Sequence, residues 1–157
     1  MKPFPEIPLS SEGAVLTVTN TSGISVPVKS AILRKLASLI EEQENLLFQH
    51  IEVVFVNEND IIDINREYLS RDYVTDIITF RYDENGNNQA IEGTLFCCAQ
   101  RIGEQSAEFG TAKKSEFYRV YIHGLLHLAG YDDQLPEQKE KMTKLEDYYL
   151  EQMMNLL

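Results

Sequence analysis

Hydrophobic and polar residues follow two different periods along the first third of the chain. Residues 14–19, VLTVTN, alternate apolar and polar side chains, which is typical of a half-buried strand. Residues 27–48 repeat leucine and isoleucine at helical spacing, with glutamate and lysine on the opposite side, and predict an amphipathic helix. Residues 51–56, IEVVFV, are a β-branched run of the length of a buried strand. The chain therefore opens with a strand, a helix and a second strand.

The middle of the chain predicts one more helix and a hairpin. Asn57 to Asp60 supply N-cap residues for a helix that continues to Tyr68. Strands are predicted at residues 76–82, DIITFRY, and 94–98, TLFCC. The intervening DENGNN is rich in residues that tolerate unusual backbone dihedrals, so the two strands are expected to pair as a hairpin.

Three helices complete the pattern. The first covers residues 100–109 and is closed by Gly110, and the second covers residues 113–129 and is stopped by Gly130. The third begins at Pro136, a favourable first-turn residue. One stripe of this last helix carries Met142, Leu145, Tyr149 and Met153.

Length and composition fit one globular domain over residues 1–157. The predicted elements form an α+β fold with a central mixed sheet of about four strands and about five helices, and the 43% of apolar residues suffice for its core. The N-terminus has prolines and a glutamate where a signal peptide needs an apolar run, and no later stretch reaches membrane-spanning length. We therefore expect a cytoplasmic protein that does not contact a membrane.

The cysteine content and the net charge exclude several kinds of site and partner. Cys97 and Cys98 are adjacent on a predicted strand and point to opposite faces, so neither a disulfide nor a cysteine metal site is expected. Fourteen basic and twenty-five acidic residues give a net charge of −11, which argues against tight, non-specific binding to a nucleic-acid backbone. Any contact with RNA must be local, and no binding to DNA is expected.

The segment HGLLHLAGYDD at residues 123–133 has the spacing of a metal site. His123 and His127 are four residues apart on a helix, so both imidazoles project from one face within reach of one ion. Gly130 ends the helix and turns the chain, which lets Asp133 return to the same ion. Three protein ligands of this kind suit Zn²⁺ and leave a fourth position for water. We predict one Zn²⁺ ion, placed at the end of this helix, and a hydrolytic reaction.

Paired histidines on an amphipathic helix are often ordinary packing or surface residues. Here two of only three histidines fall at ligand spacing, and the helix-ending glycine and the pair Asp132 and Asp133 follow at the required interval. This context favours the metal site.

Glu116 and Arg119 share the helix stripe that carries both histidines. Either charged side chain can therefore contact and orient a metal ligand such as His123 from the side away from the ion. Two interpretations remain open: an ion pair between Glu116 and Arg119 within the helix, or a direct role of Arg119 at a phosphate. The general base is open between Asp76, Glu116 and Asp132.

The chain resembles the YbeY family of bacterial endoribonucleases, also called rRNA maturation factors. Residues 123–133 resemble the family pattern HGxLHLxGYDH, and matching Glu116 and Arg119 precede them. Residues 64–80, INREYLSRDYVTDIITF, are similar to the family's LNxxYRxxxxPTDVLSF. A weaker likeness joins residues 92–98, EGTLFCC, to a family GDIxI strand.

The resemblance implies a zinc-dependent endoribonuclease specific for single-stranded RNA. It also implies a part in 16S ribosomal RNA 3′-end processing and in ribosome quality control, with ribosomal particles or ribosomal proteins as partners. The expected metal ligands are His123, His127 and Asp133. The candidate catalytic residues are Glu116, Arg119, Asp132 and Arg71.

Three positions depart from the family pattern. The third metal histidine is Asp133, the arginine after the tyrosine is Leu69, and the aspartate of GDI is Thr94. Arg66 or Arg71 can replace the missing positive charge only if the fold brings one of them to the RNA.

Two other functions compete with the ribonuclease. A zinc peptidase of the HExxH type needs a glutamate directly after the first histidine, and position 124 is glycine, which argues against it. A non-catalytic ribosome-associated assembly factor, in which a structural metal clamps the C-terminal helix, agrees with the negative charge and with Leu69.

Overall fold

The computed structural model of the chain describes residues 15–82 and 88–156. Within them lie four strands and five helices, which confirms the predicted α+β class. In chain order the elements are β1 (Leu16–Asn20), α1 (Ser30–Glu44), β2 (Phe48–Val56), α2 (Glu58–Leu69), β3 (Ile77–Arg81), β4 (Ile91–Cys98), α3 (Ala99–Phe109), α4 (Lys113–Leu128) and α5 (Pro136–Leu156).

The four strands form one mixed sheet in the order β1-β2-β4-β3. β1 pairs with β2 and β2 with β4 in parallel, whereas β3 pairs with β4 antiparallel, as a hairpin requires. The predicted DENGNN turn falls largely on residues 83–87, outside the described residues. The order places β3 at one edge of the sheet, beside the helix that carries the two histidines.

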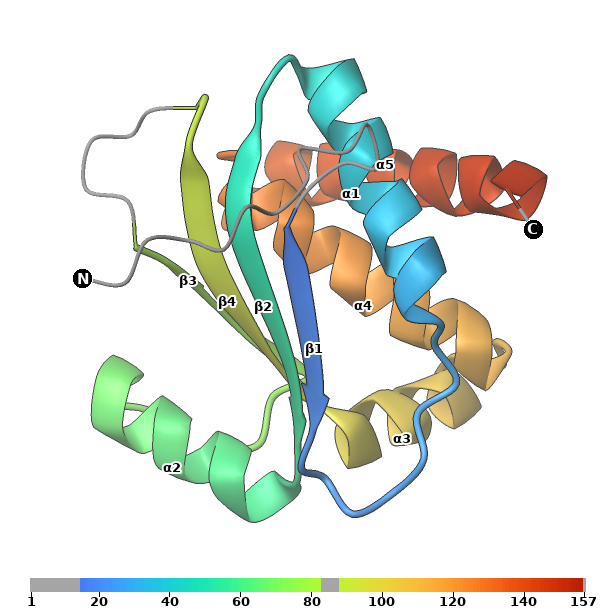
Figure 1. Cartoon of the computed structure of the whole chain (residues 1–157). Coiled ribbons are helices and arrows are strands. Elements are labelled where there is room, and N and C mark those ends of the chain that lie inside the picture. The colour runs from blue at the N-terminus through green and yellow to red at the C-terminus, as the bar shows by residue number, and fades with distance from the viewer. Residues whose placement is uncertain (1–14, 83–87, 157) are drawn as a thin grey trace.

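Helices cover both faces of the sheet unequally (Figure 1): α1, α3, α4 and α5 lie on one side, and α2 lies alone on the other. The larger core cluster fills the side with four helices, and a smaller one fills the space under α2. Cys97 belongs to the larger cluster and Cys98 to the smaller one, and both are free thiols. The prediction that the adjacent cysteines point to opposite faces and form no disulfide is confirmed.

Helix α1 is shorter than predicted. It ends at Glu44 because Asn45 adopts a left-handed conformation (φ 55°) and donates its backbone N–H to the carbonyl of Glu41. The Glu41 carboxylate then accepts the backbone N–H of Phe48, which begins β2. Leu47, predicted to lie on the helix stripe, is consequently half exposed in the turn. The helical pattern runs past a backbone turn that its own periodicity cannot reveal.

Helix α4 packs closely on the sheet at Gly124. A Cβ at this position would lie 2.7 Å from Cδ1 of Ile77 and 3.0 Å from both Cδ atoms of Leu95. A side chain as large as glutamate does not fit there without displacing this core packing. The glycine therefore lets the histidine-bearing helix lie against the sheet, and it excludes the HExxH arrangement on steric grounds as well as on sequence.

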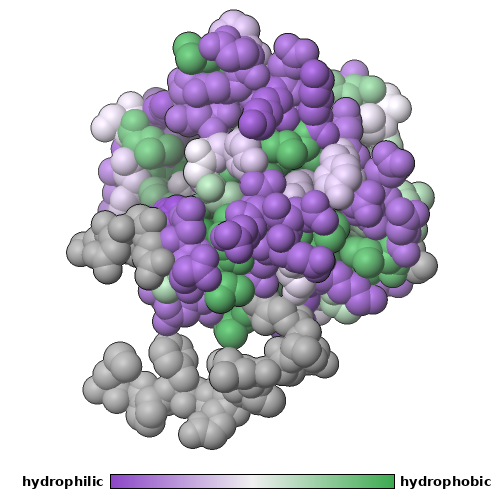
Figure 2. All heavy atoms as spheres, turned by 90° about the horizontal axis from the view of Figure 1, so that it is seen from above, coloured by the Kyte–Doolittle hydropathy of each residue, from purple (hydrophilic) through white to green (hydrophobic). Residues whose placement is uncertain are grey.

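One face of the molecule is mostly polar. Figure 2 shows one face with hydrophilic residues over most of its area and hydrophobic residues in several separate groups. Among the described residues, no helix combines the length and the apolar composition needed to cross a membrane.

Candidate metal centre

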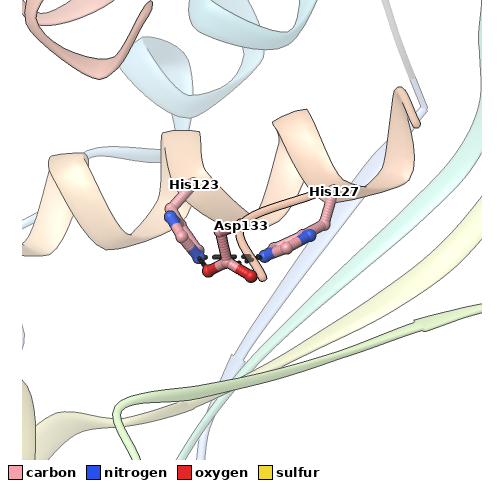
Figure 3. Close-up of side chains that lie close together, drawn as sticks. All are labelled: His123, His127 and Asp133. Atoms are coloured by element: carbon pink, nitrogen blue, oxygen red, sulfur yellow. Dashed lines mark hydrogen bonds and ion pairs between the residues drawn. The ribbon is translucent and has the colours of Figure 1, made fainter. Parts of the chain in front are cut away.

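The two histidines lie at the C-terminal end of α4, where the chain reverses. The helix ends at Leu128, and Gly130 (φ 105°) occupies a backbone region that strongly favours glycine. Its N–H donates to the carbonyl of His127 at 3.0 Å, which holds the reversal against the last helical turn. The returning segment brings Asp133 under the helix, so that all three labelled side chains point toward one another (Figure 3).

The three donor atoms have the separations expected around one metal ion. The Nε2 atoms of His123 and His127 are 3.0 Å apart, and Asp133 Oδ2 lies 3.3 Å from the first and 3.6 Å from the second. Two ligands bound tetrahedrally about 2.0–2.1 Å from a Zn²⁺ ion lie roughly 3.3 Å apart. His123, His127 and Asp133 therefore fit the predicted three-ligand group in geometry and in donor chemistry.

Both imidazoles are oriented by partners on their outer nitrogen atoms. Nδ1 of His123 lies 2.6 Å from Oε2 of Glu146, and Nδ1 of His127 lies 2.9 Å from the carbonyl oxygen of Tyr131. A carbonyl and a carboxylate only accept hydrogen bonds, so each Nδ1 carries the proton that it donates. In the neutral rings the lone pairs then sit on Nε2, directed toward the shared point.

Charge around His123 favours its protonated form in the absence of a cation. Burial by itself lowers the pKa of His123. The hydrogen bond and the charge of Glu146, together with the charges of Asp76 and Asp133, outweigh the burial, so the net pKa is raised above the ordinary value of 6.5. An environment that stabilises an imidazolium also stabilises a metal cation in the same place.

Sequence reasoning did not identify Glu146, which links α5 to this centre. The residue is 8% exposed and lies on the buried stripe of α5 with Met142, Tyr149 and Met153. Leu145 of the predicted stripe is partly buried against the larger core cluster, and the neighbouring Glu146 is buried more deeply. An ionisable residue four positions after Met142 and three before Tyr149 was the available signal, because a charge on a buried stripe needs a partner.

Arg119 pairs with α5 and not with Glu116. Its guanidinium donates to Oε1 of Glu146 at 3.0 Å and to Oδ1 of Asp147 at 2.6 Å. Of the two interpretations left open, the ion pair between Glu116 and Arg119 is not the arrangement found, because Glu146 and Asp147 of α5 pair with the arginine. Arg119 thus binds the carboxylate of Glu146, which in turn orients His123, and it does not contact the candidate metal position itself.

Glu116 and Asp76 meet at Gln105 of α3. The Gln105 amide donates to Oδ2 of Asp76 at 3.1 Å and to Oε2 of Glu116 at 3.4 Å. Glu116 is buried, and this burial, with the nearby charges of Asp76 and Glu146, raises its pKa despite the proximity of Arg119. Asp132 is instead exposed and lies outside the described lining of the cleft.

A cleft of about 440 Å³ opens beside the three ligands. Its opposite wall comes from the end of α2, the following loop and the edge strand β3, and it includes Asn65, Leu69, Arg71, Tyr73, Thr75, Asp76 and Arg81. Arg66 forms an ion pair with Asp72 on the exposed side of α2 and is not part of this lining. Of the two arginines considered as replacements for the family arginine, the fold brings Arg71 to the cleft.

Tyr131 ties the bend to two other helices. Its hydroxyl donates to Oε1 of Glu44 at 2.7 Å, and the hydroxyl of Tyr149 donates to Oε2 of the same carboxylate at 3.2 Å. Burial and Glu44 raise the pKa of Tyr131 to about 12, so the phenol remains a donor at neutral pH. The carbonyl that orients His127 is thus fixed from α1 and α5.

Comparison with known proteins agrees with this arrangement. The model of the family described as Endoribonuclease YbeY matches residues 18–154. The chain is 40% identical over 123 residues to an Endoribonuclease YbeY of Chlorobium luteolum, covering 78% of this chain and 88% of the relative. It is 38% identical over 141 residues to one of Chlorobium phaeobacteroides, covering 90% and 99%.

A solution structure of a Thermotoga maritima protein has a similar fold. It superposes with a TM-score of 0.57 at 25% identity and covers 90% of each chain. Sequence and fold thus lead to one conclusion: this chain belongs to the YbeY endoribonuclease family.

Proposed function

We propose that the chain is a metal-dependent endoribonuclease that cleaves single-stranded RNA, with one Zn²⁺ ion held by His123, His127 and Asp133. The observation that carries this proposal is the convergence of three metal-donor atoms, 3.0–3.6 Å apart, on the floor of a cleft. The names of the relatives indicate the reaction, and the donor set suits a hydrolytic zinc site. We assign the protein by analogy to 16S ribosomal RNA 3′-end maturation and ribosome quality control, on ribosomal particles in the cytoplasm.

Bound zinc supplies an acidified water and a positive charge beside the phosphate. The residues of the chain provide the remaining functions. Asp76 is the candidate for accepting the proton of the attacking water, because it lines the cleft and its carboxylate is held by Gln105. Arg71, on the opposite wall, can offset the charge that develops on the phosphate.

Glu116 and Arg119 act as supports in this proposal. Gln105 lies between Glu116 and Asp76, and Glu146 lies between Arg119 and His123. Neither Glu116 nor Arg119 is among the residues that line the cleft. Asp132 has no assigned role in the reaction because its side chain is exposed outside the cleft lining.

The experiment uses purified full-length protein, labelled single-stranded RNA and the matching duplex. Cleavage of the single strand is expected to stop with a chelator, to return with Zn²⁺, and to be lost in His123→Ala and His127→Ala. His50→Ala is the matched control, since His50 lies on β2 outside the metal group. Cleavage that survives both chelation and His123→Ala would exclude the proposal.

The alternative of a non-catalytic ribosome-associated factor rests on one observation. Leu69, where the family pattern has arginine, is exposed at the cleft. Co-sedimentation of the His123→Ala, His127→Ala double variant with ribosomal particles separates binding from chemistry. Association without any cleavage by the wild-type chain would favour this second function.

A further inference from the structure

We propose that Tyr73 and Leu69 form a wall that contacts unpaired bases beside the metal centre, an inference that rests on the proposed ribonuclease function. Leu69 is the last residue of α2, and Tyr73 lies in the loop between α2 and β3. Both line the cleft that contains His123, His127 and Asp133. Nucleotides would therefore be held by their bases on this wall while a phosphate faces the metal.

Tyr73 and Leu69 are exposed large side chains that line the cleft. Tyr73 is 51% exposed and Leu69 is 39% exposed, although the clusters on both faces of the sheet bury most such residues. An aromatic ring at the rim of a polar cleft offers a face on which a base can stack. Leu69 adds apolar surface to the lining of the same cleft, at the position where the family pattern has an arginine.

The backbone that carries Tyr73 is held in place before any RNA arrives. Asn65, whose side chain is 1% exposed, donates its amide to the carbonyl oxygen of Tyr73 at 3.0 Å. Ser70 adopts a left-handed conformation (φ 54°), and its N–H and that of Arg71 both donate to the carbonyl of Asn65. Because this backbone is already ordered, only the two side-chain torsions of Tyr73 lose conformational freedom when a base stacks on the ring.

The charges in the cleft also favour contact with bases. Arg71 and Arg81 line it, but so do Asp76 and Asp133, and the whole chain carries a charge of −11. Arg81 already donates to the carbonyl of Leu128 and to Asn88. In the metal-free chain, attraction for the phosphate backbone is therefore weak here, and stacking must supply a large share of the affinity.

This wall gives a physical reason for selecting single strands. The faces of paired bases are covered by their neighbours in a duplex, whereas an unpaired base can present its face to Tyr73. Every base has such a face, so the wall discriminates between paired and unpaired RNA and tolerates different sequences.

The test measures binding by fluorescence anisotropy with a labelled single-stranded oligouridylate, using the metal-free full-length chain so that hydrolysis does not interfere. Tyr73→Ala is expected to weaken binding roughly 5- to 150-fold, as for the loss of one stacked base, whereas Tyr73→Phe retains the wild-type affinity. Phe109→Ala, which removes an exposed aromatic ring outside the cleft lining, is the matched control. An oligonucleotide of the same length with abasic sites is expected to bind wild type and Tyr73→Ala equally.

The salt dependence of the affinity distinguishes contacts with bases from contacts with phosphates. Tyr73→Ala should leave the slope of log affinity against log salt unchanged, and Leu69→Arg should steepen it by about 0.7, the value for one added phosphate contact on a single strand. Equal affinities of wild type and Tyr73→Ala, or of intact and abasic RNA, would overturn the inference. If the wild-type chain binds unpaired RNA through Tyr73 but never cleaves it, the ribonuclease proposal is contradicted, whereas the proposal that Tyr73 and Leu69 contact bases still holds.

Discussion

Nδ1 of His123 lies 2.6 Å from Oε2 of Glu146, a carboxylate that reaches the centre from α5, 23 residues further along the chain. Arg119 holds the other oxygen of the same carboxylate, so His123 is fixed by a partner that is itself fixed. Because a carboxylate partner orients a ligating imidazole and increases its basicity, Glu146 should contribute to metal affinity without touching the ion.

Replacing Glu146 by glutamine is expected to weaken zinc binding about 10- to 100-fold. The amide retains the shape of the side chain but loses the charge that favours a donating Nδ1 on His123. A competition titration with a chromophoric chelator measures the affinity. Glu140→Gln, which changes an exposed acid on the same helix, is the control and should bind zinc like the wild type. Equal affinities for the two variants would refute the role of Glu146.

The metal-free chain should show a raised pKa at His123. Its folded-state pKa lies above the ordinary 6.5, so protonation of His123 stabilises the metal-free fold fully below about pH 6.5. That contribution is lost as the pH rises through the folded-state pKa. An NMR titration of the imidazole protons measures the shift, and Glu146→Gln should lower it because burial then dominates. A pKa that is the same in both proteins would contradict the assignment of cause.

The acidic ligand should give the reaction a pH optimum that is more alkaline than that of a site with three histidine ligands. Asp133 brings a negative charge to the centre, so the water that zinc activates is less acidic than beside three neutral imidazoles. We expect Asp133→His to move the rising limb of the pH–rate profile to lower pH, measured as initial rates of RNA cleavage across a buffer series. A profile that does not move would show that the ligand charge does not set the optimum.

Loss of the Tyr131 hydroxyl should affect stability more than metal affinity. Tyr131→Phe removes the hydrogen bond to Glu44 and is expected to cost about 1.5 kcal/mol in the free energy of unfolding, measured by urea denaturation. Its backbone carbonyl still accepts from His127, so zinc affinity should fall less than in Glu146→Gln. A variant as stable as the wild type would mean that the Glu44 contact does not brace the bend.

Much of the fold was predictable because its signals are local. Each signal lies within a few residues of the element that it specifies. Examples are the alternation of apolar and polar residues in β1, the helical spacing in α4 and Gly130, which ends α4. The convergence of the three candidate ligands was predictable for the same reason. His123, His127 and Asp133 lie within eleven consecutive residues, and one helical turn plus one glycine bend bring them together.

The remaining parts of the site depend on contacts between distant segments. Nothing near Arg119 in the sequence shows that Glu146 and Asp147 occupy its guanidinium, so an ion pair with Glu116 was an equally reasonable expectation. The choice of Arg71 over Arg66 depends on how the loop after α2 turns back under Asn65. Such features arise from tertiary packing, which helical or strand periodicity does not encode.

Anomalous diffraction from crystals of the zinc-loaded protein tests the central claim most directly. The account predicts one strong peak about 2.0–2.2 Å from Nε2 of His123, Nε2 of His127 and a carboxylate oxygen of Asp133. A peak bound by other residues, or three empty ligands in a crystal grown with zinc, would contradict it.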